Sequence, residues 1–120
     1  MPNDQAIEQE IQAKGLTAPR VTPADIEANI ASEWFYNMGE SSQFHPKNQP
    51  PPPANSPLYL LTVCVLVLKN GFTVTGESAC ASPENFDAEL GRKIARQNAV
   101  AKIWSLLGFT LKQKLYEESI

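Results

Sequence analysis

The strongest structural signal in the chain is the pair Asn70-Gly71, which separates two apolar runs. Both residues tolerate the positive φ angles of a tight turn, so the pattern predicts a β-hairpin. The first arm, residues 58–69, is apolar on both alternating faces. This is typical of a central strand that is covered on both sides, by a helix or by another protomer. The returning arm, residues 72–81, becomes small and polar along its length.

The register of this hairpin decides where the two cysteines lie. A tight turn that pairs Lys69 with Phe72 places Cys64 and Cys80 on opposite faces of the sheet. Side chains that point apart cannot form a disulfide. Two thiols without an export signal also indicate a reducing compartment. We therefore expect both cysteines to be reduced, in the core or beside a ligand.

Helical patterns precede the hairpin. Residues 3–14 are expected to form a short helix with polar flanks and a glycine stop. Thr22-Pro23-Ala24-Asp25 is a helix start, because threonine caps backbone amides and proline suits the first helical position. The apolar stripe of Ile26, Ile30 and Trp34 predicts that this second helix runs into the cluster Trp34-Phe35-Tyr36.

A proline-rich stretch, residues 37–57, follows these helices. Six of the ten prolines lie between Pro46 and Pro57. Proline lacks an amide hydrogen and restricts the residue before it, so we expect an extended linker or loop. Such a segment is a stiff spacer or, as the alternative, a docking peptide for an aromatic groove on a partner.

After the hairpin, Ser82-Pro83 predicts the start of a long helix that runs to about Leu107 and closes at Gly108. Residues 109–116 alternate and predict a third short strand, with a short helix as the alternative. The expected fold class is thus α+β in a single small domain, residues 1–120. Residues 1–36 are its helical front half, residues 37–57 the linker, and residues 58–116 a β-β-α-β core in which the hairpin packs with one long helix.

Charge and hydropathy exclude several classes of function. The net charge of −3 and the isoelectric point near 5.1 argue against a protein that binds nucleic-acid backbone. The longest apolar run, residues 58–68, is too short to span a membrane. Residues 1–40 hold seven acidic side chains against two basic ones. This acidic front half is a solvated helical face or, alternatively, a surface complementary to a partner.

The sequence offers little for catalysis. His45 is the only histidine, and no serine or cysteine can be placed beside it. Metal-ligand spacing, a phosphate-binding glycine loop and a dinucleotide fingerprint are missing from the pattern. We therefore predict no catalytic residue, no metal, no cofactor and no enzymatic activity.

Residues 76–96 are the candidate ligand site. Small residues leave space beside the strand, and the start of a capped helix offers free amides to an anion. Asn85 adds a side-chain amide and the helix adds three cations, so the expected ligand-binding residues are Gly76, Glu77, Ser78, Ser82, Asn85, Arg92, Lys93 and Arg96. The alternative is an ordinary helix cap whose cations pair with Glu89. The cluster Trp34-Phe35-Tyr36 is a stacking platform or an anchor into the core.

Three strings carry a family resemblance: residues 60–80, residues 82–87 (Ser-Pro-Glu-Asn-Phe-Asp) and residues 91–95 (Gly-Arg-Lys-Ile-Ala). They resemble a family of small tailed-phage proteins, the phage forty-nine/sixty-six family, over at least residues 57–115. Residues 18–23 also look like its usual front end. The resemblance implies no established activity. It implies a phage or prophage accessory protein that acts in the host bacterial cytoplasm. By analogy of context, small non-enzymatic phage proteins often blunt host immunity, either by binding a defence protein or by sequestering a nucleotide messenger.

The leading hypothesis is a non-enzymatic anti-defence protein that sequesters a small anionic ligand, such as a cyclic nucleotide immune signal. The pockets would be built by a homo-oligomer, because two helices do not cover both faces of the apolar strand in a monomer. The alternative is an interaction module that inhibits a host enzyme or defence protein by surface occlusion. A nucleic-acid-binding factor is the third and least favoured reading, and no membrane partner is expected.

Overall fold

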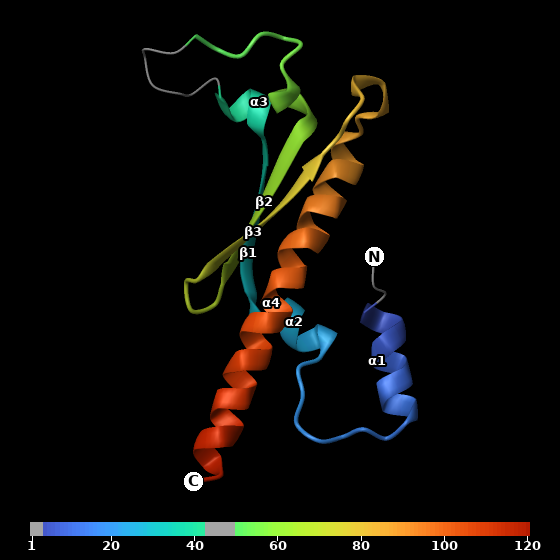
Figure 1. The fold of residues 1–120 in the computed structure, drawn as a ribbon, viewed down its shortest axis with the longest axis vertical. Helices are drawn as coiled ribbons and strands as arrows, with labels where there is room; N and C mark the ends of the chain where they lie inside the picture. Colours follow the sequence, from blue (N-terminus) through green and yellow to red (C-terminus); the bar gives the residue numbers. More distant parts are fainter. Residues whose placement is uncertain (1–3, 43–49) are drawn as a thin grey trace.

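In the computed structural model, which describes residues 4–42 and 50–120, a three-stranded antiparallel sheet packs against one long C-terminal helix (Figure 1). The predicted α+β class is confirmed. The elements in chain order are α1 (Asp4–Ala13), α2 (Pro23–Asn29), β1 (Ile30–Asn37), α3 (Met38–Ser41), η2 (Pro57–Leu60), β2 (Leu61–Leu68), β3 (Thr73–Ala79), η3 (Pro83–Asn85) and α4 (Ala88–Glu118).

The hairpin forms at Asn70-Gly71 as predicted, but its loop has three residues rather than two. Leu68 pairs with Phe72, whose carbonyl accepts a hydrogen bond from the Leu68 amide at 2.8 Å. Gly71 takes a φ of +91°, which a glycine adopts without strain. The register therefore shifts by one residue from the expected pairing.

This shift overturns the predicted placement of the cysteines. Cys64 pairs with Gly76, and Cys80 lies four residues further on, just past the end of β3. Residues an even number apart share a face, so the two thiols lie on the same side of the sheet rather than on opposite sides. They are separated by about 13 Å of strand. Both cysteines are free, as expected.

The core lies between β2 and α4. Cys64, Leu66 and Leu68 of β2 are buried against a helix face that includes Ala99 and Ile103. The intervening residues of β2 are only half-buried. Within the described ranges no element covers that second face, so the expected double cover of this strand is found on one side only. The exposed rings of Trp34 and Tyr36 border the open face, opposite Val65 and Val63.

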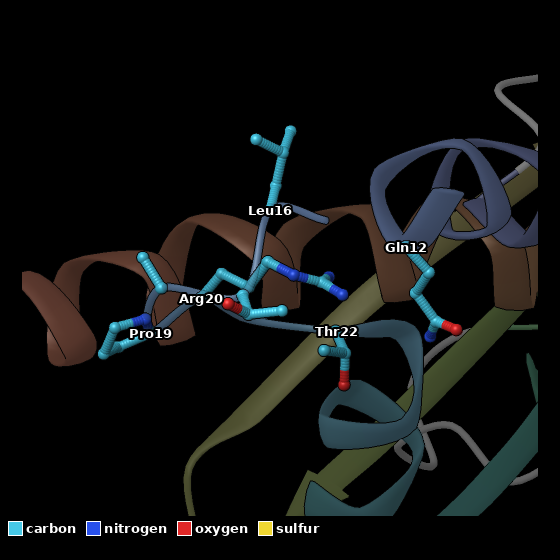
Figure 2. Close-up of a pocket in the computed structure, with 7 residues that line it drawn as sticks. Gln12, Leu16, Pro19, Arg20 and Thr22 are labelled. Carbon is cyan, nitrogen blue, oxygen red and sulfur yellow. The ribbon is translucent and has the colours of Figure 1, made fainter. Parts of the chain in front are cut away.

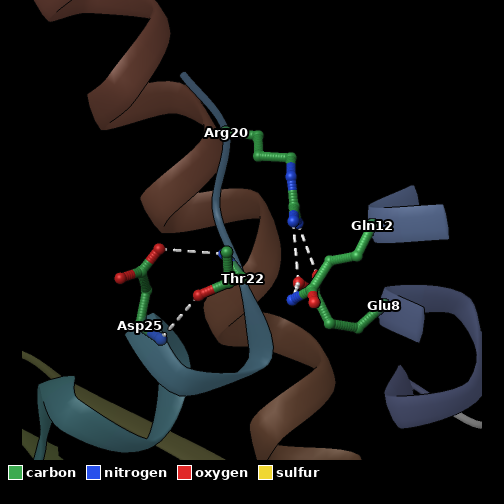
Figure 3. Close-up of polar contacts among 5 residues, drawn as sticks. All are labelled: Glu8, Gln12, Arg20, Thr22 and Asp25. Carbon is green, nitrogen blue, oxygen red and sulfur yellow. Dashed lines mark hydrogen bonds and ion pairs between the residues drawn. The ribbon is translucent and has the colours of Figure 1, made fainter. Parts of the chain in front are cut away.

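The front half begins as predicted and then departs from the prediction. Thr22 and Asp25 form a capping box, with Thr22 Oγ1 accepting from the Asp25 amide at 3.1 Å (Figure 3). However, α2 ends at Asn29, and the segment expected to continue it becomes the edge strand β1. The β-branched and aromatic side chains of Ile30–Asn37 suit a pleated surface, and pairing with β2 decides the outcome.

The predicted third strand at residues 109–116 is wrong. These residues continue α4, which passes through Gly108 without a break and ends at Glu118. The predicted helix start at Ser82-Pro83 is also wrong, because residues 83–85 form the short η3 and α4 begins at Ala88. In the linker, residues 50–56 form neither helix nor strand, whereas residues 43–49, which include His45 and Pro46, lie outside the described residues.

Candidate functional site

Gly76 does not provide room for a ligand, because α4 fills that room. A β-carbon at Gly76 would collide with the carbonyl oxygen of Ala95 and the amide nitrogen of Ala99. The small residue thus lets the helix backbone approach the sheet. A small residue in a strand is here required for packing of the helix against the sheet, and it does not indicate space for a ligand.

Glu77 and Ser78 lie on different faces of β3. Glu77 is exposed on the face away from α4, where its carboxylate accepts from Thr75 Oγ1 at 3.3 Å. Its backbone carbonyl accepts from Asn98 Nδ2 at 2.7 Å, which ties β3 to α4. Ser78 is half-buried on the opposite face, the one that α4 covers.

The N-terminus of α4 carries a negatively charged side chain of its own. Ser82 makes no side-chain cap, and the capping residue of α4 is Asp87, whose carboxylate accepts from the Leu90 amide at 3.0 Å. An anionic ligand would therefore meet a carboxylate where free amides were expected. The sequence signal that identifies the cap is Asp87 directly before the helix-forming run Ala88-Glu89-Leu90.

Arg96 is already engaged inside the protein. Its guanidinium donates to both carboxylate oxygens of Glu27, at 3.1 and 2.8 Å, and to Glu33 at 2.7 Å. These contacts raise the pKa of Arg96 above its ordinary value and lower the pKa of Glu27. Arg96 thereby joins α4 to α2 and β1, which makes it a structural clamp.

The two remaining cations differ from each other. Lys93 pairs with Glu89 at 3.4 Å on the exposed side of α4, an ordinary helix-surface pair. Arg92 has no ion pair or hydrogen bond with any residue in the described parts of the chain. Among the three predicted cations of the site, Arg92 is therefore the one whose charge is available to a ligand.

Arg92 lines a hollow of about 180 Å³ between the start of α4 and the edge of the sheet. The other lining residues come from β1, α3, β2, the segment before α4 and the first turn of α4: Phe35, Tyr36, Asn37, Glu40, Thr62, Phe86 and Ala88. A guanidinium beside aromatic rings is suited to a planar, anionic molecule.

Thr62 adds an unsatisfied polar group to this hollow. Its side chain is only 4% exposed, and its hydroxyl has no hydrogen-bond partner in the described structure. A buried hydroxyl without a partner is costly, so a ligand or a water molecule that bonds it would be favoured. Both polar atoms of the Asn37 side chain are instead engaged: Nδ2 donates to the Tyr59 carbonyl at 2.9 Å, and Oδ1 accepts from the Gly39 and Glu40 amides. Asn37 therefore supports the wall.

A second hollow of about 210 Å³ lies on the other side of Phe86, which lines both. The predicted residues Ser78 and Asn85 meet there, together with Cys80, Leu90 and Ile94. The predicted site thus divides in two, with Arg92 in one hollow and Ser78 and Asn85 in the other. Thr62 and Phe86 were missed as site residues. Thr62 lies in an apolar strand pattern and Phe86 in the pattern of the predicted helix. Both patterns predict a core position and do not indicate a site.

A larger, shallow hollow of about 580 Å³ lies between α1 and α2, and Gln12, Leu16, Pro19, Arg20 and Thr22 are among its lining residues (Figure 2). Arg20 is not free there, because its guanidinium donates to both carboxylate oxygens of Glu8, one at 2.7 Å (Figure 3). These hydrogen bonds lower the pKa of Glu8 from 4.5 to about 2. The charge of Arg20 is thus matched internally, so this hollow is a weaker anion site than that of Arg92.

No cluster of three or more metal-ligating side chains occurs in residues 4–42 and 50–120. Within the same ranges no helix has both the length and the apolar character needed to cross a membrane.

The fold and the hollows define a small α+β protein in which the one free arginine of the predicted site lines a hollow together with aromatic residues. More particularly, the chain belongs to the phage protein (N4 Gp49/phage Sf6 gene 66) family, whose model matches residues 21–115. The expected family resemblance is therefore confirmed. No match was found among curated proteins or among solved structures.

Proposed function

We propose that this phage protein binds a small anionic, nucleotide-like ligand in the Arg92 hollow and holds it without chemical change. The observation that carries the proposal is the unpaired guanidinium of Arg92 in a hollow that Phe35 and Phe86 also line, together with the unpartnered hydroxyl of Thr62. Cation, ring and hydroxyl match the phosphate, the base and the sugar of a nucleotide in turn.

The size of the hollows supports a shared site. Ligand pockets commonly measure about 300–1,000 Å³. Each hollow beside Phe86 is smaller than this, at about 180 and 210 Å³. One hollow therefore accommodates part of a nucleotide, and the rest of the ligand extends into the second hollow or toward a neighbouring copy. We accordingly keep a homo-oligomer as part of the proposal.

Sequestration fits the lining of the Arg92 hollow better than a reaction does. Glu40 is its one carboxylate, and the lining holds neither histidine nor cysteine. A base paired with a positioned nucleophile, the usual requirement for covalent catalysis, is missing from that set. We propose on this ground that the protein is not an enzyme and that the ligand is released unaltered.

Membership of a phage family suggests the setting. A phage protein that acts in the host bacterial cytoplasm would meet the nucleotide messengers of host immunity there. Removal of such a signal, for example a cyclic dinucleotide or trinucleotide, would be an anti-defence function.

The second candidate is occlusion of a host protein, and the open face of the sheet favours it. Trp34 is 54% exposed and Tyr36 is 42% exposed, and both flank the half-buried valines of β2. Exposed aromatic side chains over an apolar surface are typical of protein interfaces.

Calorimetric titration against a panel of cyclic di- and trinucleotides tests the first candidate. We expect binding of at least one member, with the unchanged nucleotide recovered after the protein is denatured. Recovery of a hydrolysed product would contradict sequestration. An absence of heat across the panel would contradict ligand binding and leave the occlusion of a host protein as the leading function.

A further inference from the structure

The hydrophobic core opens to solvent at the end of the sheet where β2 turns into β3. Strand β2 ends at the buried Leu68, whereas α4 continues beyond the sheet (Figure 1). Leu106 and Leu107 follow the buried Ile103 on α4, and both are only half-buried although they pack against the core. The sheet therefore stops covering the helix at this point, and apolar side chains of both elements stay accessible.

A hollow of about 430 Å³, here called the hairpin hollow, lies at this opening between the hairpin tip, the end of α2 and α4. Ligand pockets commonly measure about 300–1,000 Å³ and are lined mainly by apolar side chains, with a few polar groups. The hairpin hollow has both properties, since five of its nine lining residues are apolar: Leu68, Phe72, Leu106, Leu107 and Phe109. It is about twice as large as either hollow beside Phe86.

The two phenylalanines that line the hairpin hollow are left in water. Phe109 is 72% exposed and Phe72 is 55% exposed. An apolar molecule in the hollow would remove part of this surface from water, which is the main favourable term in binding of apolar groups. The lining thus favours an occupant with an apolar body.

Three polar residues of the hairpin hollow offer free donors. Lys69 is its one charged lining residue, and the ammonium has no ion pair within residues 4–42 and 50–120. Asn70 Oδ1 accepts from the Phe72 amide at 2.9 Å, which leaves Nδ2 as the free end of that side chain. The side-chain amide of Asn29 has no hydrogen bond with any described residue. A cation and two amides without a carboxylate are complementary to an anion.

We propose that the hairpin hollow binds a small organic acid with an apolar body and one carboxylate. The apolar body is covered by Phe72 and Phe109, and the carboxylate accepts from the Lys69 ammonium. A neutral hydrocarbon would leave this ammonium without a partner. A molecule with several phosphates would instead bring excess charge against apolar side chains, which is costly.

The hairpin hollow is separate from the site of the proposed function. About 21 Å of helix lies between Arg92 and Leu106, and the Arg92 hollow shares no lining residue with the hairpin hollow. The proposal for the hairpin hollow therefore does not depend on a nucleotide at Arg92, and each proposal can fail without the other.

Titration with 2-naphthoate, two fused rings with one carboxylate, tests the proposal at pH 7 by nuclear magnetic resonance. We expect saturable binding with a Kd below about 1 mM and shifts of the amides of residues 68–72 and 106–110. 2-Naphthalenemethanol has the same rings without the charge and should bind about threefold more weakly or worse, because it lacks the ion pair with Lys69. An absence of saturation, or equal affinity for the two compounds, would overturn the proposal.

Two pairs of variants locate the site. Phe109→Glu adds a negative charge at an exposed lining position and should raise the Kd for 2-naphthoate about tenfold or more. Tyr116→Glu, an exposed aromatic position of α4 outside the lining, is its control and should leave the Kd within about twofold. Lys69→Gln should raise the Kd about threefold, whereas Lys112→Gln, an exposed lysine outside the lining, should not. Unchanged affinity in both Phe109→Glu and Lys69→Gln contradicts the assignment.

Arg92→Ala separates the two hollows, because an aromatic carboxylate could also enter the Arg92 hollow. We expect this variant to bind 2-naphthoate with the affinity of the wild type. A tenfold loss in Arg92→Ala together with wild-type binding by Phe109→Glu would place the probe beside Arg92 and overturn the hairpin hollow as its site. Helical circular dichroism of every variant should match the wild type, since all the substituted hairpin-hollow side chains are exposed.

Discussion

The α-carbon of Gly76 on β3 lies directly against the backbone of Ala95 on α4, with no space between them for a β-carbon. This contact fixes how closely the long helix approaches the sheet. It explains why a strand of small residues is required in the centre of the molecule. The buried Ala95 and Ala99 on the helix side complete the close approach.

Gly76→Ala should destabilise the protein by about 1–3 kcal/mol, because overpacking against backbone forces the helix to move. Denaturant unfolding measures the effect. Glu77→Ala, on the neighbouring exposed position, is the matched control and should stay within about 0.5 kcal/mol of the wild type. Equal stability of the two variants would show that the helix approach is not tight.

The caps of α4 give a second comparison. Asp87→Ala removes the carboxylate that accepts from the Leu90 amide and should cost about 1 kcal/mol of stability. Ser82→Ala removes no cap hydrogen bond and should cost far less. The melting temperatures of the two variants show whether Asp87 or Ser82 caps the helix. A larger loss for Ser82→Ala would restore the serine as the helix cap.

Arg96 should act on stability rather than on ligand binding. Its hydrogen bonds to Glu27 and Glu33 join three elements, so Arg96→Ala should lower the free energy of unfolding by about 1 kcal/mol. The measurement is urea unfolding at low and high salt, since screening weakens such pairs. A variant as stable as the wild type at low salt would contradict the clamp.

The Glu8–Arg20 pair predicts acid sensitivity. The pKa of Glu8 falls from 4.5 to about 2 in the folded protein, mainly because Arg20 donates hydrogen bonds to it. A carboxyl whose pKa is lowered by folding stabilises the protein above its unfolded pKa, and this contribution is lost as the pH falls from about 4.5 toward 2. Carboxyl titration by nuclear magnetic resonance should show the low pKa in the wild type. In Arg20→Ala the pKa should return toward 4.5, and an unchanged value would remove Arg20 as the cause.

The sequence predicted the elements that depend on local chemistry. The turn at Gly71, the capping box of Thr22 and Asp25, and the helix at residues 4–13 follow from side chains close in the chain. The strand β1 could not be predicted from local chemistry, because Ile26, Ile30 and Trp34 also have the spacing of a helix. Its pairing with β2 comes from a segment about 30 residues away, which local patterns do not report.

The C-terminal error has a related cause. Leu107, Leu111 and Leu115 fit a helix, whereas the local alternation of residues 109–116 fits a strand equally well. Gly108 predicts a helix stop, but a glycine inside a long helix costs only about 1 kcal/mol, and α4 continues through it. Of the predicted site residues, Arg92 lines one hollow, and Ser78 and Asn85 line another. The sequence could not show that Arg96 is neutralised by carboxylates more than 60 residues away.

The most direct test of ligand binding compares Arg92→Ala with Lys93→Ala in calorimetric titrations of the cyclic nucleotide that the wild type binds. Arg92 is the free cation of the Arg92 hollow, whereas Lys93 is an exposed neighbour that pairs with Glu89. The account predicts that Arg92→Ala raises the Kd about tenfold or more, since a charge-assisted hydrogen bond contributes roughly 1.5–3 kcal/mol. Lys93→Ala should leave the Kd within about twofold, and neither variant should lower the melting temperature appreciably. Equal affinities for wild type and Arg92→Ala would contradict the proposed site.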